Sequence, residues 1–160
     1  MGLRDKLAAG RFAIMAEMEP PKGTDLGPMM ANAARVKGDV DAVLVPEMTS
    51  AVMRMSSLGA AMMLQAKGLE TIMQANCRDR NRLALQSDAL GAAALGIVNI
   101  LCLTGDHQQF GDCPKGQNVF DLDSTQLLDS VRAMRDDGKM ISGTEVDGKP
   151  AMFIGAAANP

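Results

Sequence analysis

Residues 70–106 read ETIMQANCRDRNRLALQSDALGAAALGIVNILCLTGD, and this stretch decides the fold. It contains a mostly apolar run over 70–76, a helix-like segment over 80–94, and a second apolar run over 97–103. Because the run over 97–103 is apolar on both faces, it is typical of a central strand in a parallel sheet. The stretch therefore predicts a strand, a helix and a second strand that runs parallel to the first.

The same alternation extends toward the amino terminus. The predicted elements there are a strand, a helix, a strand and a helix, over 12–18, 26–37, 41–45 and 50–66. Thr24 or Asp25 can cap the first of these helices, and Pro28 is tolerated in its first turn. The predicted strands begin about 30 residues apart, which is the spacing of successive βα units.

The carboxyl-terminal part adds one helix and one strand. Residues 121–124 form a good N-cap cluster for a helix over 125–136. Asp147–Gly148 lies between two apolar runs and predicts a β-hairpin, whose second arm, 151–155, becomes the fifth main strand. The chain is thus predicted to be one α/β unit, with all strand-to-helix loops at the same end.

The composition is that of a globular chain. The 160 residues are 47% hydrophobic and 22% charged, which argues against disorder. Phe occurs 4 times, Trp and Tyr are absent, and the net charge is −3, so neither base-stacking platforms nor a basic stripe for nucleic acid is present. The apolar run over 97–103 is far shorter than a membrane span of about 20 residues. The first twelve residues lack the apolar core of a secretory signal, so we expect a cytoplasmic protein.

Cysteine and histidine usage argues against several kinds of site. Cys77, Cys102 and Cys113 are odd in number and show no CxxC spacing, so we expect reduced thiols, with the first two partly buried. His107 is the single histidine, which excludes a multi-histidine zinc site. No GxGxxG, GxxxxGK[ST] or GxSxG motif occurs, so the common nucleotide-phosphate and hydrolase signatures are absent.

Polar side chains gather where the predicted strands end, which is where parallel α/β folds place their functional groups. Glu17 and Glu19 share one face of the first strand, so at least one should point to the interior. A partly desolvated carboxylic acid there could donate a proton near neutral pH, whereas the alternative is a solvated loop carboxylate. Asp106 follows the most buried strand, and its alternative role is an N-cap or turn aspartate.

The CRDRNR segment, residues 77–82, combines dense charge with a helix start. Arg78, Arg82 and the helix N-terminus could bind a phosphate. The segment could instead be a solvated, salt-bridged cap, which the pattern alone favours slightly.

Taken together, these strand ends resemble those of the methylenetetrahydrofolate reductase family, flavoproteins with a (β/α)8 barrel. The matching stretches are AEMEPPKG, SAVMRMS, residues 76–106, VFDLDS and FIGAAANP. The resemblance covers essentially the whole chain and implies one partial TIM-barrel domain over 1–160. SAVMRMS would open the second predicted helix.

The resemblance implies a reaction and site residues. Hydride from reduced FAD would pass to the iminium of 5,10-methylenetetrahydrofolate, giving 5-methyltetrahydrofolate. Glu17 would be the general acid that helps to open the imidazolidine ring, and Asp106 would lie beside the flavin and the pterin. The positions implied to hold FAD are Gln74, Arg78, Asp79, Asn81, Leu103, Thr104, Gly105, Asp106, Phe120, Asp121 and Ala157. The electron donor would be NAD(P)H or a ferredoxin-type partner, and the protein would form a homo-oligomer or pair with a partner subunit.

The sequence departs from the family pattern in three places. Many members have Thr where this chain has Pro46, and a His-x-Thr-Cys run where it has residues 74–77. Some members have a ring-stacking Tyr where this chain has Ala157. Each change removes a flavin contact that the resemblance would otherwise imply.

The number of strands is the largest departure. Eight strands close a (β/α)8 barrel, over about 250 residues, and only five are predicted here. We expect a fragment of a longer sequence; the alternatives are pairing with a second chain or copy that completes the barrel, and a non-catalytic remnant. The alternative function is accordingly a non-catalytic flavin-binding or interaction subunit that needs a second chain.

Overall fold

A computed structural model describes residues 1–157, which contain one sheet of five parallel strands. The strands are β1 (Met15–Glu17), β2 (Ala42–Val45), β3 (Thr71–Asn76), β4 (Asn99–Leu103) and β5 (Phe153–Ala156). Each strand pairs with the next one along the chain, so the sheet order equals the chain order. Because every connection steps across the sheet in the same direction, the helices that follow the strands lie on one face. This is the winding of a (β/α)8 barrel, of which five strands are present, and not that of a doubly wound sheet.

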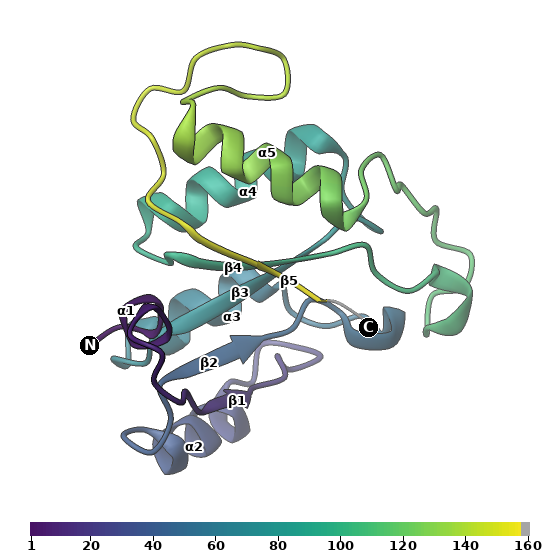
Figure 1. Ribbon diagram of the computed structural model, residues 1–160. Helices are drawn as coiled ribbons and strands as arrows, with labels where there is room; N and C mark the ends of the chain where they lie inside the picture. Colours follow the sequence, from purple (N-terminus) through teal and green to yellow (C-terminus); the bar gives the residue numbers. More distant parts are fainter. Residues whose placement is uncertain (158–160) are drawn as a thin grey trace.

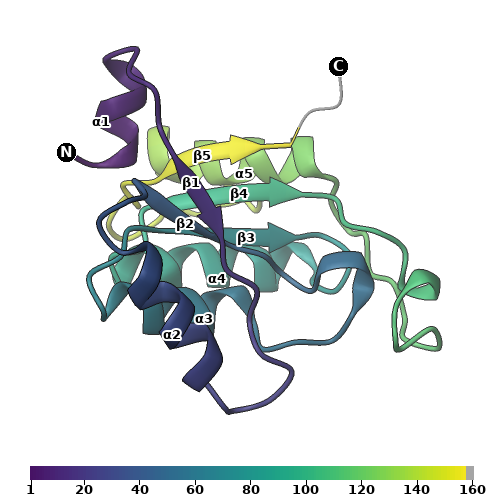
Figure 2. The ribbon, with the colours of Figure 1, turned by 90° about the horizontal axis from the view of Figure 1, so that it is seen from below.

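The helices make the outer layer of the molecule. They are α1 (Leu3–Ala8), α2 (Gly27–Val36), α3 (Ser57–Gln65), α4 (Arg82–Ala94) and α5 (Ser124–Asp136), with short 3-10 turns η1 (Thr49–Ala51) and η2 (Gln108–Phe110). Figures 1 and 2 show α2 to α5 along one side of the sheet, while α1 lies near the amino-terminal ends of the strands. Among residues 1–157, no helix is both long and apolar enough to cross a membrane.

The two faces of the sheet are packed differently. The face toward the helices carries the main core, in which Val43, Val45 and Ile100 are almost completely buried. The other face carries a small cluster in which Leu3 of α1 covers Ala42 and Ile72. The inner face of the partial barrel is therefore covered by α1 only near the amino-terminal ends of the strands.

Most predicted elements are confirmed, because their boundaries rest on local signals. Asn81 caps α4 by accepting hydrogen bonds from two backbone amides, and Asp123 forms a capping box with Gln126 at the start of α5. Neither candidate cap before α2 is its N-cap, which is Leu26 and makes no side-chain hydrogen bond; Asp25 Oδ1 instead accepts a hydrogen bond from the Gly27 amide at 2.9 Å.

The amino-terminal region differs from the prediction. The strand expected over 12–18 shortens to β1, because the Ile14 amide donates to the Asp41 carboxylate at 2.8 Å and Phe12 is 84% exposed. Helix α1 was not predicted. It has no side-chain cap, and it is held by the Glu70 carboxylate, which accepts a hydrogen bond from the Leu3 amide at 3.0 Å.

The helix expected over 50–66 is also wrong in its first part. The helix begins at Ser57 and is capped by Ser56, so SAVMRMS precedes α3 and does not open it. Two amides in this segment donate to distant acceptors: Met53 to Asp112 Oδ1, and Met55 to the Pro21 carbonyl, both at 2.9 Å. These long-range hydrogen bonds replace those that a helix would make.

The hairpin predicted at Asp147–Gly148 is wrong as well. The chain turns earlier, where the Met140 amide donates to the Thr144 carbonyl at 2.9 Å and Lys139 bridges Glu145 in antiparallel fashion. The predicted fifth strand is nevertheless present as β5, which pairs parallel to β4.

Candidate active site

The carboxyl ends of β2, β3 and β4 are joined by the buried guanidinium of Arg78, which is 1% exposed. Its Nε and Nη2 donate to the Asp79 carboxylate at 2.8–3.1 Å. Nη2 also donates to the Met48 carbonyl at 3.2 Å, and Nη1 to the Asp106 carbonyl at 3.3 Å. Arg78 thus has no exposed surface for a phosphate. It is salt-bridged, as in the cap alternative, but it is enclosed and not solvated.

A second buried charge, Glu47, follows β2. Its carboxylate is 3% exposed and accepts hydrogen bonds from the Ser57 amide at 2.5 Å and from Arg80 Nη1 at 2.8 Å. Burial opposes the charge of Arg80, but Glu47 and Asp88 outweigh it and raise the pKa of Arg80 above its ordinary value. The Glu47 amide donates to Gln74 Oε1 at 2.9 Å, so this predicted FAD position is engaged in holding the loop.

Sequence reasoning gave Glu47 no role, although it lies at a strand end. The available signal was its position directly after Pro46, at the end of an apolar strand. That position cannot show burial, because the partners of Glu47 come from α3 and from the CRDRNR segment.

The end of β4 places Asp106 at the surface. Gly105 has φ +91°, and an added Cβ would lie 2.5 Å from Asn76 Oδ1, so this close approach requires glycine. Thr104 Oγ1 accepts a hydrogen bond from the Ser124 amide at 3.0 Å, which ties the strand end to α5. Within residues 1–157, no hydrogen bond reaches the exposed Asp106 carboxylate, which is therefore available to a ligand.

Glu17 ends β1 and is exposed, so the expected partial desolvation is wrong and the solvated alternative fits. It pairs in register with Leu44 of β2, which places both side chains on the inner face of the sheet. Its neighbour Glu19 pairs with Arg54 at 2.8 Å. A cavity of about 390 Å³ lies here, and Glu17, Asn32 and Arg54 are among its lining residues.

The other predicted FAD positions on loops lie at the same end of the sheet. Asn81 is engaged as the cap of α4. Asp121 binds Arg82 at 2.8 Å, and these hydrogen bonds lower the pKa of the Asp121 carboxyl to about 2. The Phe120 amide donates to the Cys77 carbonyl at 3.1 Å, and the Phe120 ring is half exposed. Ala157 is exposed after β5, and the rest of the GAAANP ending, residues 158–160, lies outside the described residues.

These positions fit one part of a flavin better than another. Leu101, Leu103 and Gly155 are half-buried on the inner face of β4 and β5, and they offer apolar surface on the strands whose ends lead to the exposed Asp106. That chemistry suits the isoalloxazine ring. The phosphates would need other donors, because the guanidinium of Arg78 is enclosed.

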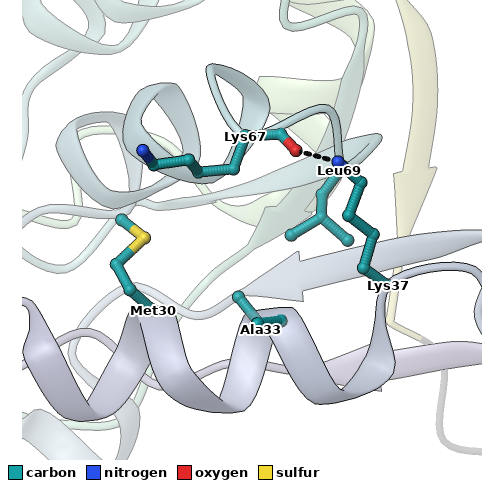
Figure 3. Close-up of a pocket in the computed structure, with 6 residues that line it drawn as sticks. Met30, Ala33, Lys37, Lys67 and Leu69 are labelled. Atoms are coloured by element: carbon teal, nitrogen blue, oxygen red, sulfur yellow. Dashed lines mark hydrogen bonds between the residues drawn. The ribbon is translucent and has the colours of Figure 1, made fainter.

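Two features lie outside this site. Burial raises the pKa of the Cys77 thiol to about 11 and that of Cys102 to about 12, which keeps both thiols protonated and unreactive. A cavity of about 310 Å³ in Figure 3 is lined by Met30, Ala33 and Leu69, with Lys37 and Lys67 beside them. It lies between α2 and the segment before β3, away from the carboxyl ends of the strands.

A singly wound parallel sheet with carboxylates at its carboxyl edge defines the barrel-type α/β fold class, of which five strands are present. The family model described as methylenetetrahydrofolate reductase matches residues 2–158. The chain belongs to the methylenetetrahydrofolate reductase family. Membership supports an oxidoreductase of folate metabolism, and the family is generally flavin-dependent. A comparison with curated proteins found no match.

Proposed function

We propose that this protein reduces 5,10-methylenetetrahydrofolate to 5-methyltetrahydrofolate with FAD, and that Glu17 is the general acid. The family match over residues 2–158 carries the proposal. The two carboxylates to which the proposal gives roles accept no hydrogen bond within residues 1–157: Glu17 and Asp106 are both exposed at the carboxyl edge, while Glu47 and Asp79 are held in ion pairs.

The free carboxylates have different tasks. Glu17 lies on the inner face of an edge strand, and a pterin packed over it would exclude water and favour the protonated acid. Its proton would then pass to the imidazolidine nitrogen as the ring opens. Asp106 would hold the pterin and the flavin in place, with Leu103, Thr104 and Gly105 forming the surface beneath the ring. When bound, FAD supplies the hydride.

The test starts with the purified protein. We expect it to bind FAD with a flavin absorption spectrum and to reduce methylenetetrahydrofolate with an artificial electron donor. Glu17→Gln should abolish folate turnover while flavin reduction continues. Glu19→Gln is the matched control, since Glu19 pairs with Arg54 and should leave turnover largely unchanged. Loss of both half-reactions, or of neither, in Glu17→Gln contradicts the acid role.

The natural electron donor is proposed to be NAD(P)H or a ferredoxin-type protein. Supplying each one to the FAD-loaded protein, and following bleaching of the flavin, separates the two. A donor that bleaches the flavin within a turnover time is supported, and one that does not is excluded.

A second candidate is an interaction subunit that acts only with another chain. Within the described residues, β1 and β5 each pair on one side only. Met15 in β1 is exposed, as are Phe12 and Ile14 in the segment just before it. A colourless, inactive protein that gains activity on addition of a second chain would support this candidate over the stand-alone enzyme.

A further inference from the structure

The loop after β2 holds an unusual backbone. Met48, Ser50 and Ala51 have φ values of 48°, 53° and 58°, in the left-handed region that residues other than glycine rarely adopt. Such conformations persist only where the surrounding structure holds them, and they cluster at functional loops. The contacts of this loop should therefore show what holds it.

Arg78 is one of these contacts. Its Nη2 donates to the carbonyl of Met48, the first of the left-handed residues, at 3.2 Å. The loop after β4 supplies the others: Asp112 Oδ1 accepts a hydrogen bond from the Met53 amide at 2.9 Å, and a Cβ on Gly111 would overlap the Ala51 carbonyl. The two loops are thus in direct contact.

The same guanidinium also holds the loop after β4. Nη1 donates to the Asp106 carbonyl at 3.3 Å. The Asp79 carboxylate, which neutralises Arg78, accepts a hydrogen bond from Gln108 Nε2 at 2.7 Å. The ion pair of Arg78 and Asp79 therefore contacts both the loop after β2 and the loop after β4.

We propose that Arg78 is a positioning residue that couples the loop over 46–53 to the loop over 104–112, so that the two keep or lose their arrangement together. The coupling stands on these contacts alone. Its consequence for turnover rests on the proposed function, which places Asp106 beside the flavin and the pterin.

The role requires arginine. A guanidinium has five donors in a fixed plane and can serve a carboxylate and two carbonyls in different directions at once. Lysine carries the same charge but has a single nitrogen, which cannot span these acceptors. Arg78→Lys therefore separates charge from geometry, and Arg78→Met removes both.

Hydrogen exchange on the protein without ligand tests the coupling directly. The Ala51 amide donates to the Met48 carbonyl, and the Phe110 amide to the His107 carbonyl, both at 3.1 Å, so each reports on one loop. In Arg78→Lys and Arg78→Met we expect exchange at both amides to rise together by about tenfold or more, as when a hydrogen bond to a charged group is lost. Amides in α5 should change little. Arg132→Met, which removes an exposed guanidinium from α5, is the control.

Two results would overturn the proposal: faster exchange in one loop only, or no change in either. If the Arg78 variants do not fold, hydrogen exchange in the unmodified protein still tests the coupling. Its Ala51 and Phe110 amides should then open with the same denaturant dependence, and different dependences would contradict the coupling.

Ligand measurements test the consequence for function. Where the unmodified protein binds FAD, Arg78→Lys should weaken binding about tenfold and raise KM for the folate more than it lowers kcat, whereas Arg132→Met should change neither. An unchanged Kd and KM in a folded Arg78→Lys protein would overturn this consequence. If the unmodified protein binds no FAD, the proposed function fails, while hydrogen exchange still tests the coupling.

Discussion

The strand ends of β2 to β4 and the strand end of β1 carry similar residues in very different surroundings. Around β2 to β4, Glu47 and Arg78 are buried and bonded to neighbouring loops. At the end of β1, Glu17 is exposed and reaches no such partner among residues 1–157. The comparison shows that charges at the carboxyl edge of the sheet divide into those that hold the loops and those that accept no hydrogen bond within the described residues.

The largest expected effect tests this division by removing a buried carboxylate. Glu47→Ala leaves the Ser57 amide without its acceptor and the Arg80 guanidinium with Asp88 as its remaining partner, and we expect a loss of about 3 kcal/mol in the free energy of unfolding. Glu19→Ala removes a half-exposed carboxylate from its pair with Arg54 and should cost about 0–1 kcal/mol. Urea unfolding of both variants measures the difference, and equal losses would contradict the division.

The second prediction concerns the backbone of the held region. Gly105→Ala must adopt a positive φ and also displace the Asn76 side chain, which accepts a hydrogen bond from the Arg78 amide at 2.7 Å. Gly143 has a similar φ of +85° but open space around it, so Gly143→Ala isolates the conformational cost, about 1–2 kcal/mol. We expect Gly105→Ala to cost about 1 kcal/mol more, the value of one hydrogen bond. Thermal unfolding compares the two variants, and a larger loss at Gly143 would refute the contact.

The third prediction concerns the free carboxylate. Glu17→Gln removes a charge that no neighbour needs, so the free energy of unfolding should change by no more than about 0.5 kcal/mol. A loss above about 2 kcal/mol in the free energy of unfolding would show that Glu17 is one of the charges that hold the loops. Any loss of turnover in that variant would then reflect instability.

The sequence predicts the elements whose signals are local. Strands β2 to β4 follow from apolar runs, and α4 and α5 follow from the caps Asn81 and Asp123. Helix α1 could not be predicted from local signals, because the Glu70 carboxylate that holds it is 67 residues away from Leu3. The composition of the segment before α3 predicts a helix, but the Met53 amide in this segment binds Asp112, which lies 59 residues away.

The location of the candidate site could be predicted from the sequence, but the surroundings of each charged residue could not. Strand periodicity put Glu17 and Asp106 at the correct edge of the sheet. It could not distinguish the exposed Glu17 from the buried Glu47, because burial depends on Ser57 and Arg80, which reach Glu47 from 10 and 33 residues away. The dense charge of CRDRNR likewise fits both a salt-bridged cap and a phosphate site, and it is the partners of Arg78 that distinguish the two.

The smallest expected effect lies at the edge of the held region, in the exposed pair of Asp121 and Arg82. The pKa of the Asp121 carboxyl is lowered to about 2 from an ordinary value of 3.8, chiefly by the hydrogen bond from Arg82. A lowered folded-state pKa stabilises the protein above the ordinary value, and this stability is lost as the pH falls toward 2. The stability difference between the unmodified protein and Asp121→Asn should therefore be constant above about pH 4 and shrink between pH 4 and 2. Urea midpoints across this range measure it. In an Arg82→Met background the shrinkage should become smaller but not vanish, because the guanidinium hydrogen bonds are lost while the backbone amide of residue 82 still donates to Asp121. An unchanged shrinkage would show that the Arg82 guanidinium is not its source.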